Sequence, residues 1–436
     1  MIVKILAISF ILLLLTVESS LQTSIIWDRA SAWTPWLYKV GPFSIADIVI
    51  IIVSLYVLFR FILRPVIINS PYVGLCLLAL VYLCIGLIYN LSVFTLWKPY
   101  FYDIKIVLFL TVPFLFLMML KKDARVLQWL SPKRIFIYYA LAGVIDFSIV
   151  NIFGESEYPS YLGYPAVPQI FPFSLIIVGI IFGTKKKYKI LFLLMFGIEL
   201  LNAVNRLSLG ILFNAGAIIL YILILSVNVK VGVRAVLVIF SVFFVNVMAV
   251  LLITNPLNMA MLAAKGEGFT TRQVQLENVL LNFNINIPGV IGKGLGSTWF
   301  EMVPIPETDI YSVGSSVGKS SESAMASPVK FIFNWTPPSL LYKWGVIGSL
   351  LLCCLVAFYF QRYANEIRQL KRLGVNKMNI RYLYALLIIS TIYILENFTY
   401  IGQAKQSLIT SIIVFNAVYS IQAKFVETHS VVSHGE

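Results

Sequence analysis

The sequence predicts an all-α membrane protein with about twelve transmembrane helices. Two properties of the chain predict this class. Hydrophobic residues make up 60% of its 436 residues and charged residues only 12%, a balance outside the range of soluble globular proteins. The hydrophobic residues also lie in long unbroken runs, close to the roughly 20 residues that a helix needs to cross a bilayer. Such runs exclude a β-barrel, in which apolar and polar residues alternate.

Charges, prolines and glycines bound the apolar runs and so delimit the predicted spans. These spans lie at residues 3–20, 43–63, 71–90, 104–120, 135–153, 169–184, 190–205, 207–228, 235–254, 338–361, 382–398 and 406–422. A cleaved signal peptide is the alternative for the first run, but no small-x-small cleavage site follows it, so we expect a retained span. One long polar stretch interrupts the series between the ninth and tenth spans. We therefore predict a single membrane domain, residues 1–436, with residues 255–337 as an inserted loop.

The distribution of basic residues predicts the orientation in the membrane. The net charge of +14 would point to nucleic acid only if the basic residues gathered on one exposed face. Here they recur on alternate loops, which is the pattern of the positive-inside rule. Both termini are therefore predicted to be cytoplasmic and the 255–337 loop extracytoplasmic. Because ATP is absent on that side, chemistry in the loop would need a substrate that arrives already activated, such as a lipid-linked sugar.

The 255–337 loop carries a predicted helix and a glycine-rich turn. Residues 271–283 have leucines and valines at helical spacing, and Pro288-Gly289 is expected to end this helix. The turn that follows contains Gly292, Gly294 and Gly296 around Lys293, and could offer backbone N–H groups and a cation to an anionic ligand. Alone, this pattern is weak, and it is no dinucleotide fingerprint because no strand precedes it.

Two arginines are candidate phosphate-binding residues. Arg206 follows Glu199 and Asn202 on one helix face at the edge of a span. It could snorkel or pair with Glu199, but a guanidinium at the membrane surface also suits a diphosphate. Arg272 opens the loop helix, where it is either a solvated loop residue or a second anion contact.

The carboxylates of the predicted spans lie near their ends. Glu396, near the outer end of the eleventh span, could act as a base, orient a positive partner, or pair with an outer-edge lysine. Asp103 is expected to cap its helix. The only histidines, His429 and His434, lie in the C-terminal tail, which excludes serine-histidine catalysis and histidine metal sites. We expect neither a metal nor a cofactor.

The order of these features resembles that of a known family. Asn205-Arg206-Leu207-Ser208 opens an apolar helix, Arg272 follows in a loop helix, then comes Gly292-Lys293-Gly294-Leu295-Gly296, and residues 339–348 begin the next span. This order is similar to that of the O-antigen ligase and polymerase (Wzy-type) superfamily of membrane glycosyltransferases. The resemblance covers residues 189–352 well and implies a GT-C-like membrane architecture.

The resemblance also implies roles for individual residues. Arg206 and Arg272 match arginines that hold the diphosphate of an undecaprenyl-linked oligosaccharide, and Glu396 matches an acid near the outer end of a late helix. The further expected substrate contacts are Asn205, Gly292, Lys293, Gly294, Gly296, Trp299, Asn334 and Lys343. Ligases of the family carry a His-Asn pair shortly before the tenth span, where this chain has Asn334-Trp335, so polymerisation is favoured over ligation.

The expected activity is therefore polymerisation of lipid-linked repeat units into a bacterial surface polysaccharide or exopolysaccharide. The expected location is the bacterial inner membrane, with membrane lipids and polysaccharide assembly or export proteins as further partners and no nucleic acid. A ligase that transfers finished glycan to another acceptor, a transporter or flippase of lipid-linked oligosaccharide, and a non-enzymatic assembly partner remain the alternatives. A transporter would be marked by charges at mid-span and by internal pseudosymmetry.

Overall fold

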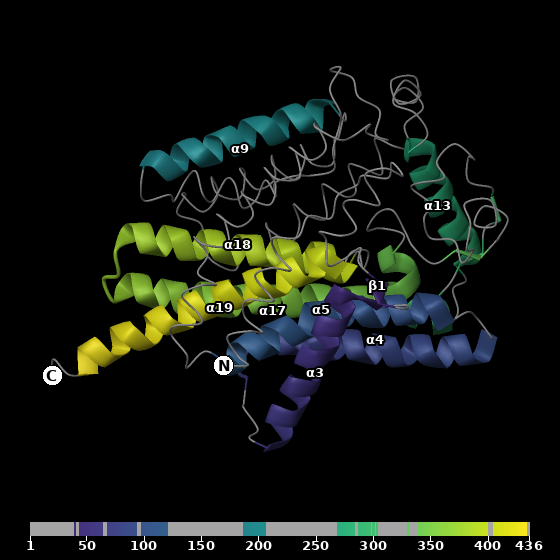
Figure 1. Ribbon diagram of the computed structural model, residues 1–436, viewed down its shortest axis with the longest axis horizontal. Helices are drawn as coiled ribbons and strands as arrows, with labels where there is room; N and C mark the ends of the chain where they lie inside the picture. The colour runs from purple at the N-terminus through teal and green to yellow at the C-terminus, as the bar shows by residue number, and fades with distance from the viewer. Residues whose placement is uncertain are drawn as a thin grey trace.

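The described part of the chain is mostly helical (Figure 1). The computed structural model describes residues 39–40, 43–63, 68–93, 97–120, 186–205, 268–283, 287–297, 299–300, 302–303, 329–330, 339–399 and 404–433. Its helices are α3 (Ile45–Leu63), α4 (Pro71–Val93), α5 (Trp97–Leu120), α9 (Lys186–Asn205), α13 (Gly268–Asn282), α14 (Ile287–Ile291), the π-helical turn η2 (Leu340–Trp344), α17 (Gly345–Arg372), α18 (Lys377–Thr399) and α19 (Ala404–Ser433).

Six of these helices are long and apolar enough to cross a membrane, so the chain is a multi-pass membrane protein. Their apolar segments are Ile45–Leu63, Pro71–Tyr89, Tyr100–Leu120, Leu340–Arg372, Asn379–Phe398 and Ser407–Thr428. They confirm as helices six of the predicted spans. A seventh prediction, residues 190–205, coincides with α9, whose apolar part Ile190–Leu201 is shorter. The remaining predicted spans, at residues 3–20, 135–153, 169–184, 207–228 and 235–254, lie outside the described residues.

Local sequence signals explain where several helices begin and end. At the start of α3, the backbone N–H of Ser44 donates to Asp47 and the N–H of Asp47 donates to the Ser44 hydroxyl, a reciprocal capping box. Pro71 opens α4 at a position where its missing N–H costs nothing. Gly374, with φ of 81°, ends α17. The N–H groups of Gly374 and Val375 then donate to Lys371 and Leu370, the Schellman pattern.

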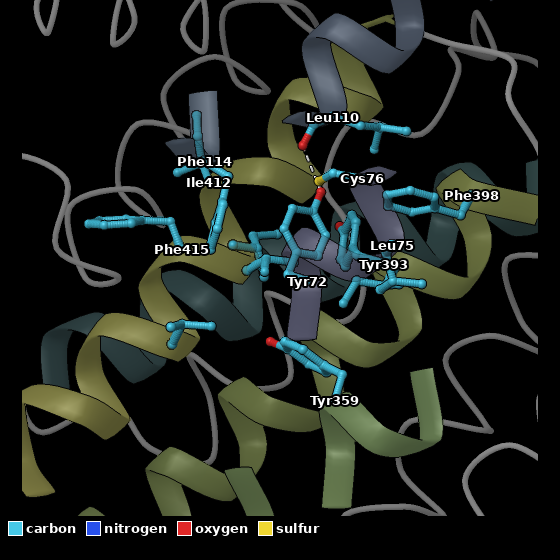
Figure 2. Close-up of a cluster of buried hydrophobic side chains, with 14 of the residues drawn as sticks. Tyr72, Leu75, Cys76, Leu110, Phe114, Tyr359, Tyr393, Phe398, Ile412 and Phe415 are labelled. Atoms are coloured by element: carbon cyan, nitrogen blue, oxygen red, sulfur yellow. Dashed lines mark hydrogen bonds between the residues drawn. The ribbon is translucent and has the colours of Figure 1, made fainter. Parts of the chain in front are cut away.

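The spanning helices form one bundle with an apolar interior. α19 packs along α5 and α18, α17 packs along α18 and α4, and α3 and α4 both pack on α5. Figure 2 shows side chains of α4, α5, α17, α18 and α19 around Tyr72 of α4. The ring of Tyr72 lies edge-on to Phe114 at 4.7 Å, and its hydroxyl donates to the backbone oxygen of Leu110 at 2.7 Å. The buried hydroxyl is thus satisfied inside the bundle, as a polar group in an apolar interior requires.

The tenth predicted span differs most from expectation. Predicted at residues 338–361, it begins as a π-helical turn and continues to Arg372. The apolar segment Leu340–Arg372 has 33 residues, about 50 Å of helix, and therefore exceeds the roughly 30 Å hydrocarbon core. The charged residues that follow residue 361, the predicted end of the span, therefore still belong to this helix. The helix continues beyond the predicted span in solvent-exposed turns.

The loop that precedes this helix is organised by short elements. The predicted loop helix is confirmed as α13. Pro288 and Gly289 do not simply terminate it, because they belong to a second short helix, α14. Two strands, β3 (Trp299–Phe300) and β4 (Val329–Lys330), pair antiparallel and bring distant parts of the loop together. Near the start of α3, β1 (Lys39–Val40) pairs in the same way with β2 (Phe43–Ser44).

Candidate functional site

The glycine-rich turn, residues 292–296 and here called the GKGLG segment, lies against the ends of three spanning helices. The N–H groups of Lys293 and Gly294 donate to the backbone oxygens of Tyr342 and Lys343 in η2, at 3.0 and 2.9 Å. The N–H of Leu295 donates to the backbone oxygen of Tyr82 in α4 at 2.9 Å. The carbonyl groups of the π-helical turn thus accept hydrogen bonds from the loop. The GKGLG segment, which is distant from α4 in sequence, joins α4 to the start of α17.

The glycines are needed because backbone meets backbone. Gly292, Gly294 and Gly296 have φ of 97°, 83° and 81°, values that residues with a side chain rarely adopt. A Cβ at Gly294 would lie 2.1 Å from the backbone nitrogen of Gly86, and one at Gly292 would lie 2.4 Å from the carbonyl carbon of Trp344. The glycine pattern therefore serves close packing, and Lys293 is the only long polar side chain that the segment presents.

A buried ion pair fixes the far end of the GKGLG segment. Asp103 of α5 and Lys343 of η2 lie 2.7 Å apart, with side chains 1% and 3% exposed. The same carboxylate oxygen accepts the N–H of Gly296 at 2.6 Å. Asp103 therefore links α5, η2 and the loop at a single atom, and a charge-assisted bond of this kind is stronger than a neutral one.

These contacts change the expectation for four predicted ligand contacts, Lys293, Gly294, Gly296 and Lys343. The N–H groups of residues 293–296 all donate to protein atoms, so in this arrangement those of Gly294 and Gly296 are not available to an anion as predicted. Lys343 was expected to touch substrate, but its ammonium is buried against Asp103. Sequence spacing could not show this, because the acceptors come from α4, α5 and η2. Lys293 keeps only its side chain for binding.

Tyr82 holds the same junction from the α4 side. Its hydroxyl lies 2.7 Å from the backbone oxygen of Ile291 and 3.0 Å from that of Trp344, and its ring packs on the Trp344 ring at 4.6 Å. Gly348 allows this approach, because a Cβ there would lie 2.1 Å from the Tyr82 hydroxyl. α4, α14 and the start of α17 are therefore tied together around one phenol.

The side chain of Lys293 lies on an aromatic surface. Its ammonium donates to the Tyr342 hydroxyl at 2.7 Å and lies 4.2 Å from the centre of that ring and 5.6 Å from the centre of the Tyr89 ring. Partial burial lowers the pKa of Lys293 below that of an ordinary lysine, because desolvation disfavours the charged form. The nearby rings and the phenol oxygen favour the cation. The ammonium therefore lies in a partly dry setting in which its aromatic neighbours offset part of the cost of burial.

The loop helix α13 is anchored at the same place. Val279 of α13 packs against Tyr342, with Leu341 beside them. The side-chain amide of Asn278 donates to the backbone oxygen of Val303, and its oxygen accepts from the N–H groups of Met302 and Val303. Arg272 lies on α13 two helical turns before Val279, and Trp299 lies in β3, which packs on α13. Two predicted site positions therefore belong to elements held beside Tyr342.

The other predicted site residues are less closely placed. Glu396 lies near the C-terminal end of α18, which the antiparallel α17–α18 hairpin brings to the end of the bundle where α17 begins (Figure 1). Asn205 is the last residue of α9. Arg206 and Asn334 lie outside the described residues. Within the described part of the chain, no group of three or more His, Cys, Asp or Glu side chains could hold a metal ion.

Sequence reasoning missed the partners that define this site. Asp103 was expected only to cap its helix, and Tyr82, Tyr89 and Tyr342 were not singled out. One signal was available, because Asp103 and Lys343 carry opposite charges at span ends predicted to lie on the same side of the membrane. No known protein-family model matches this chain, and no curated protein matches it either.

Proposed function

We propose that the chain is a membrane glycosyltransferase, a Wzy-type polysaccharide polymerase. It would transfer a growing glycan from undecaprenyl diphosphate onto a lipid-linked repeat unit, on the extracytoplasmic side of the bacterial inner membrane. The proposal includes about twelve spans in a GT-C-like architecture, with both termini in the cytoplasm. It rests on the ordered resemblance described above and on one structural observation.

That observation is the attachment of the long loop to the ends of the spans. Segments of the loop that are far apart in sequence, α13 and the GKGLG segment, both pack against η2 at the start of α17. A site that acts on a lipid-linked substrate needs such a place, where a fixed part of a polar loop meets the end of the membrane core. Its cation, Lys293, lies beside Tyr89, the last residue of an apolar segment.

The proposed mechanism needs no metal. A glycosyl diphosphate is already activated, so the enzyme must orient the acceptor hydroxyl, accept its proton and neutralise the leaving diphosphate. We assign neutralisation of the diphosphate to Arg206 and Arg272, and proton acceptance or orientation of the acceptor to Glu396. The new glycosidic bond forms as the bond to the diphosphate oxygen breaks. Asp103 and Lys343 would hold the site in place without touching substrate.

The direct test is a reconstituted polymerisation assay. Cells that lack the protein should accumulate the lipid-linked repeat unit, which can be extracted and incubated with the purified protein with and without a divalent-metal chelator. We expect a ladder of products in both cases. Arg206→Ala and Arg272→Ala should abolish the ladder while the protein still inserts in the membrane, and Lys371→Ala, an exposed cation at the opposite end of α17, should not.

Other outcomes would contradict the proposal in distinct ways. Full ladders from both arginine variants would remove their role in neutralising the diphosphate. A single transfer of finished glycan to a different acceptor would indicate a ligase. Repeat units that cross a vesicle membrane chemically unchanged would indicate a transporter.

A further inference from the structure

Lys293 stands out among the described cations near the GKGLG segment. Lys343 pairs with Asp103, and Lys105 pairs with Asp47 at 2.7 Å. No carboxylate among the described residues forms an ion pair with Lys293. A partly buried ammonium is costly unless an anion or an equivalent partner compensates for the lost water. The Tyr342 hydroxyl and the rings of Tyr342 and Tyr89 compensate for part of the lost hydration. Among the described residues, however, no negative charge pairs with the ammonium.

The position of Lys293 relative to the membrane indicates which class of anion its ammonium could bind. The apolar segments of α4, α5 and the η2–α17 helix end or begin at Tyr89, Tyr100 and Leu340. Lys293 lies against Tyr89 and Tyr342, so its ammonium is level with the ends of these segments. At that depth the hydrocarbon core gives way to lipid phosphates, and tyrosines commonly mark this boundary.

The local backbone holds the ammonium in a defined place. The N–H groups of Lys293 and of the next three residues are all bonded to α4, α5 or η2, and glycines of positive φ lie on both sides of the lysine. The lysine side chain is then directed by its bond to the Tyr342 hydroxyl. Such pre-organisation reduces the ordering cost of binding a ligand. A lysine that merely extended into the headgroup region would need none of it.

We propose that Lys293 and Tyr342 form a binding site for the phosphate group of a membrane lipid. Lys293 supplies the charge, and the Tyr342 ring and hydroxyl hold the ammonium in place. Two lipids carry this chemistry: a polyprenyl diphosphate, and an anionic phospholipid of the bilayer. The inference stands whether or not the protein joins sugars.

The test is binding of two probes to delipidated protein in detergent, followed by native mass spectrometry and by titration. The probes are undecaprenyl diphosphate and phosphatidylglycerol. Lys293→Gln should weaken binding of at least one probe about ten- to a hundredfold, the usual contribution of a charge-assisted hydrogen bond. Lys293→Arg, which keeps the charge, should bind within a few-fold of the wild type. Tyr342→Phe should weaken binding less than Lys293→Gln, because the ring remains.

The matched control is Lys371→Gln, which removes one positive charge from the exposed last turn of α17, at the other end of that helix. It should leave the affinity for both probes unchanged. The backbone bonds of the GKGLG segment do not use the lysine side chain, so Lys293→Gln should also keep the thermal unfolding temperature of the wild type. A larger loss with undecaprenyl diphosphate assigns the site to a polyprenyl lipid, and a larger loss with phosphatidylglycerol assigns it to the bilayer.

Two results would overturn the inference. One is equal affinity of the wild type and Lys293→Gln for both probes, and the other is no saturable binding of either probe to the wild type. The outcome is separable from the proposed function. A protein that binds through Lys293 but builds no ladder keeps this site and loses the polymerase assignment. A protein that builds a ladder, and whose Lys293→Gln variant binds both probes as the wild type does, keeps the polymerase assignment and loses this site.

Discussion

Two lysines close to Tyr342, one in η2 and one in the GKGLG segment, have different surroundings. Lys343 is buried and bonded to Asp103, whereas Lys293 is partly exposed and bonded to the Tyr342 hydroxyl. Breaking a buried ion pair by removing one partner leaves an uncompensated charge, which is far costlier than losing a pair at the surface. The structural role of Lys343 and the binding role proposed for Lys293 therefore follow from their partners rather than from residue type.

We expect Lys343→Met to be strongly destabilising, by about 3–5 kcal/mol, because Asp103 would remain buried and charged. The double variant Asp103→Asn with Lys343→Met should recover most of this loss, since the asparagine oxygen can still accept the N–H of Gly296. Thermal unfolding in detergent measures both.

Lys105→Met is the matched control for this pair. Its partner Asp47 is more exposed, at 13% of the side chain against 1% for Asp103, so the loss of Lys105 should cost clearly less than the loss of Lys343. For the Asp103–Lys343 pair, the double variant could instead lose as much unfolding free energy as its two single variants together. That result would show that the ion pair does not act as a unit.

At the scale of elements, the contact between α4 and the GKGLG segment depends on small residues. Helices in a membrane gain little from the hydrophobic effect among themselves, so close backbone approach and hydrogen bonds carry much of their association. Gly86 allows this approach, because a Cβ there would lie 1.7 Å from the backbone oxygen of Leu295. Backbone atoms on both sides leave no flexible side chain to move away.

We expect Gly86→Ala to displace the GKGLG segment from α4 and to lower stability by at least about 1–3 kcal/mol, the usual cost of overpacking. Thermal unfolding and limited proteolysis near Lys293 report the two effects. The control on the same helix is Gly74→Ala, whose Cβ would meet only the Leu355 side chain at 3.4 Å. Equal unfolding temperatures for the two variants would contradict the close contact.

At the scale of the whole molecule, exposed cations gather where α17 ends and α18 begins. The GKGLG segment, α13 and the start of α17 lie at one end (Figure 1). The turns at the other end of α17 and the start of α18 carry exposed cations, among them Lys371, Arg372, Lys377 and Arg381. An excess of Lys and Arg marks the cytoplasmic side, so we expect the GKGLG segment to face outward.

Cysteine labelling tests this orientation. In a variant without the four native cysteines, which are all free, Met302→Cys should react with a membrane-impermeant maleimide in intact cells. Lys371→Cys should react only after the cells are permeabilised. Met302 is 55% exposed, so access should not limit its reaction. The opposite pattern would reverse the orientation and move the proposed site to the cytoplasm.

The sequence predicted well those elements whose formation depends on contiguous residues. Apolar runs located six described spanning helices to within a few residues at most ends, and the periodicity of residues 271–283 located α13. The π-helical turn η2 and the extension of α17 to Arg372 were not predicted. The π-helical turn was missed because its carbonyl groups accept hydrogen bonds from the distant loop. The extension of α17 was missed because hydropathy falls where the helix leaves the membrane, although the helix itself continues.

The candidate site was predictable only in part. The pattern Gly292-Lys293-Gly294-Leu295-Gly296 indicated exposed N–H groups, whereas the structure bonds those of residues 293–296 to protein acceptors. A glycine pattern is the same whether the backbone approaches a ligand or another backbone. The roles of Arg206, Arg272 and Glu396 stay predictions.

By itself, the sequence determined that this is a multi-pass helical membrane protein and which residues interrupt its spans, because hydropathy and helix length are properties of contiguous residues. Only the tertiary structure decided that Lys343 pairs with Asp103, that the GKGLG segment packs on α4 and η2, and that the Lys293 ammonium donates to the Tyr342 hydroxyl. These outcomes depend on contacts between residues up to 262 positions apart, such as Tyr82 with Trp344, and no local pattern specifies which distant acceptor a donor will meet.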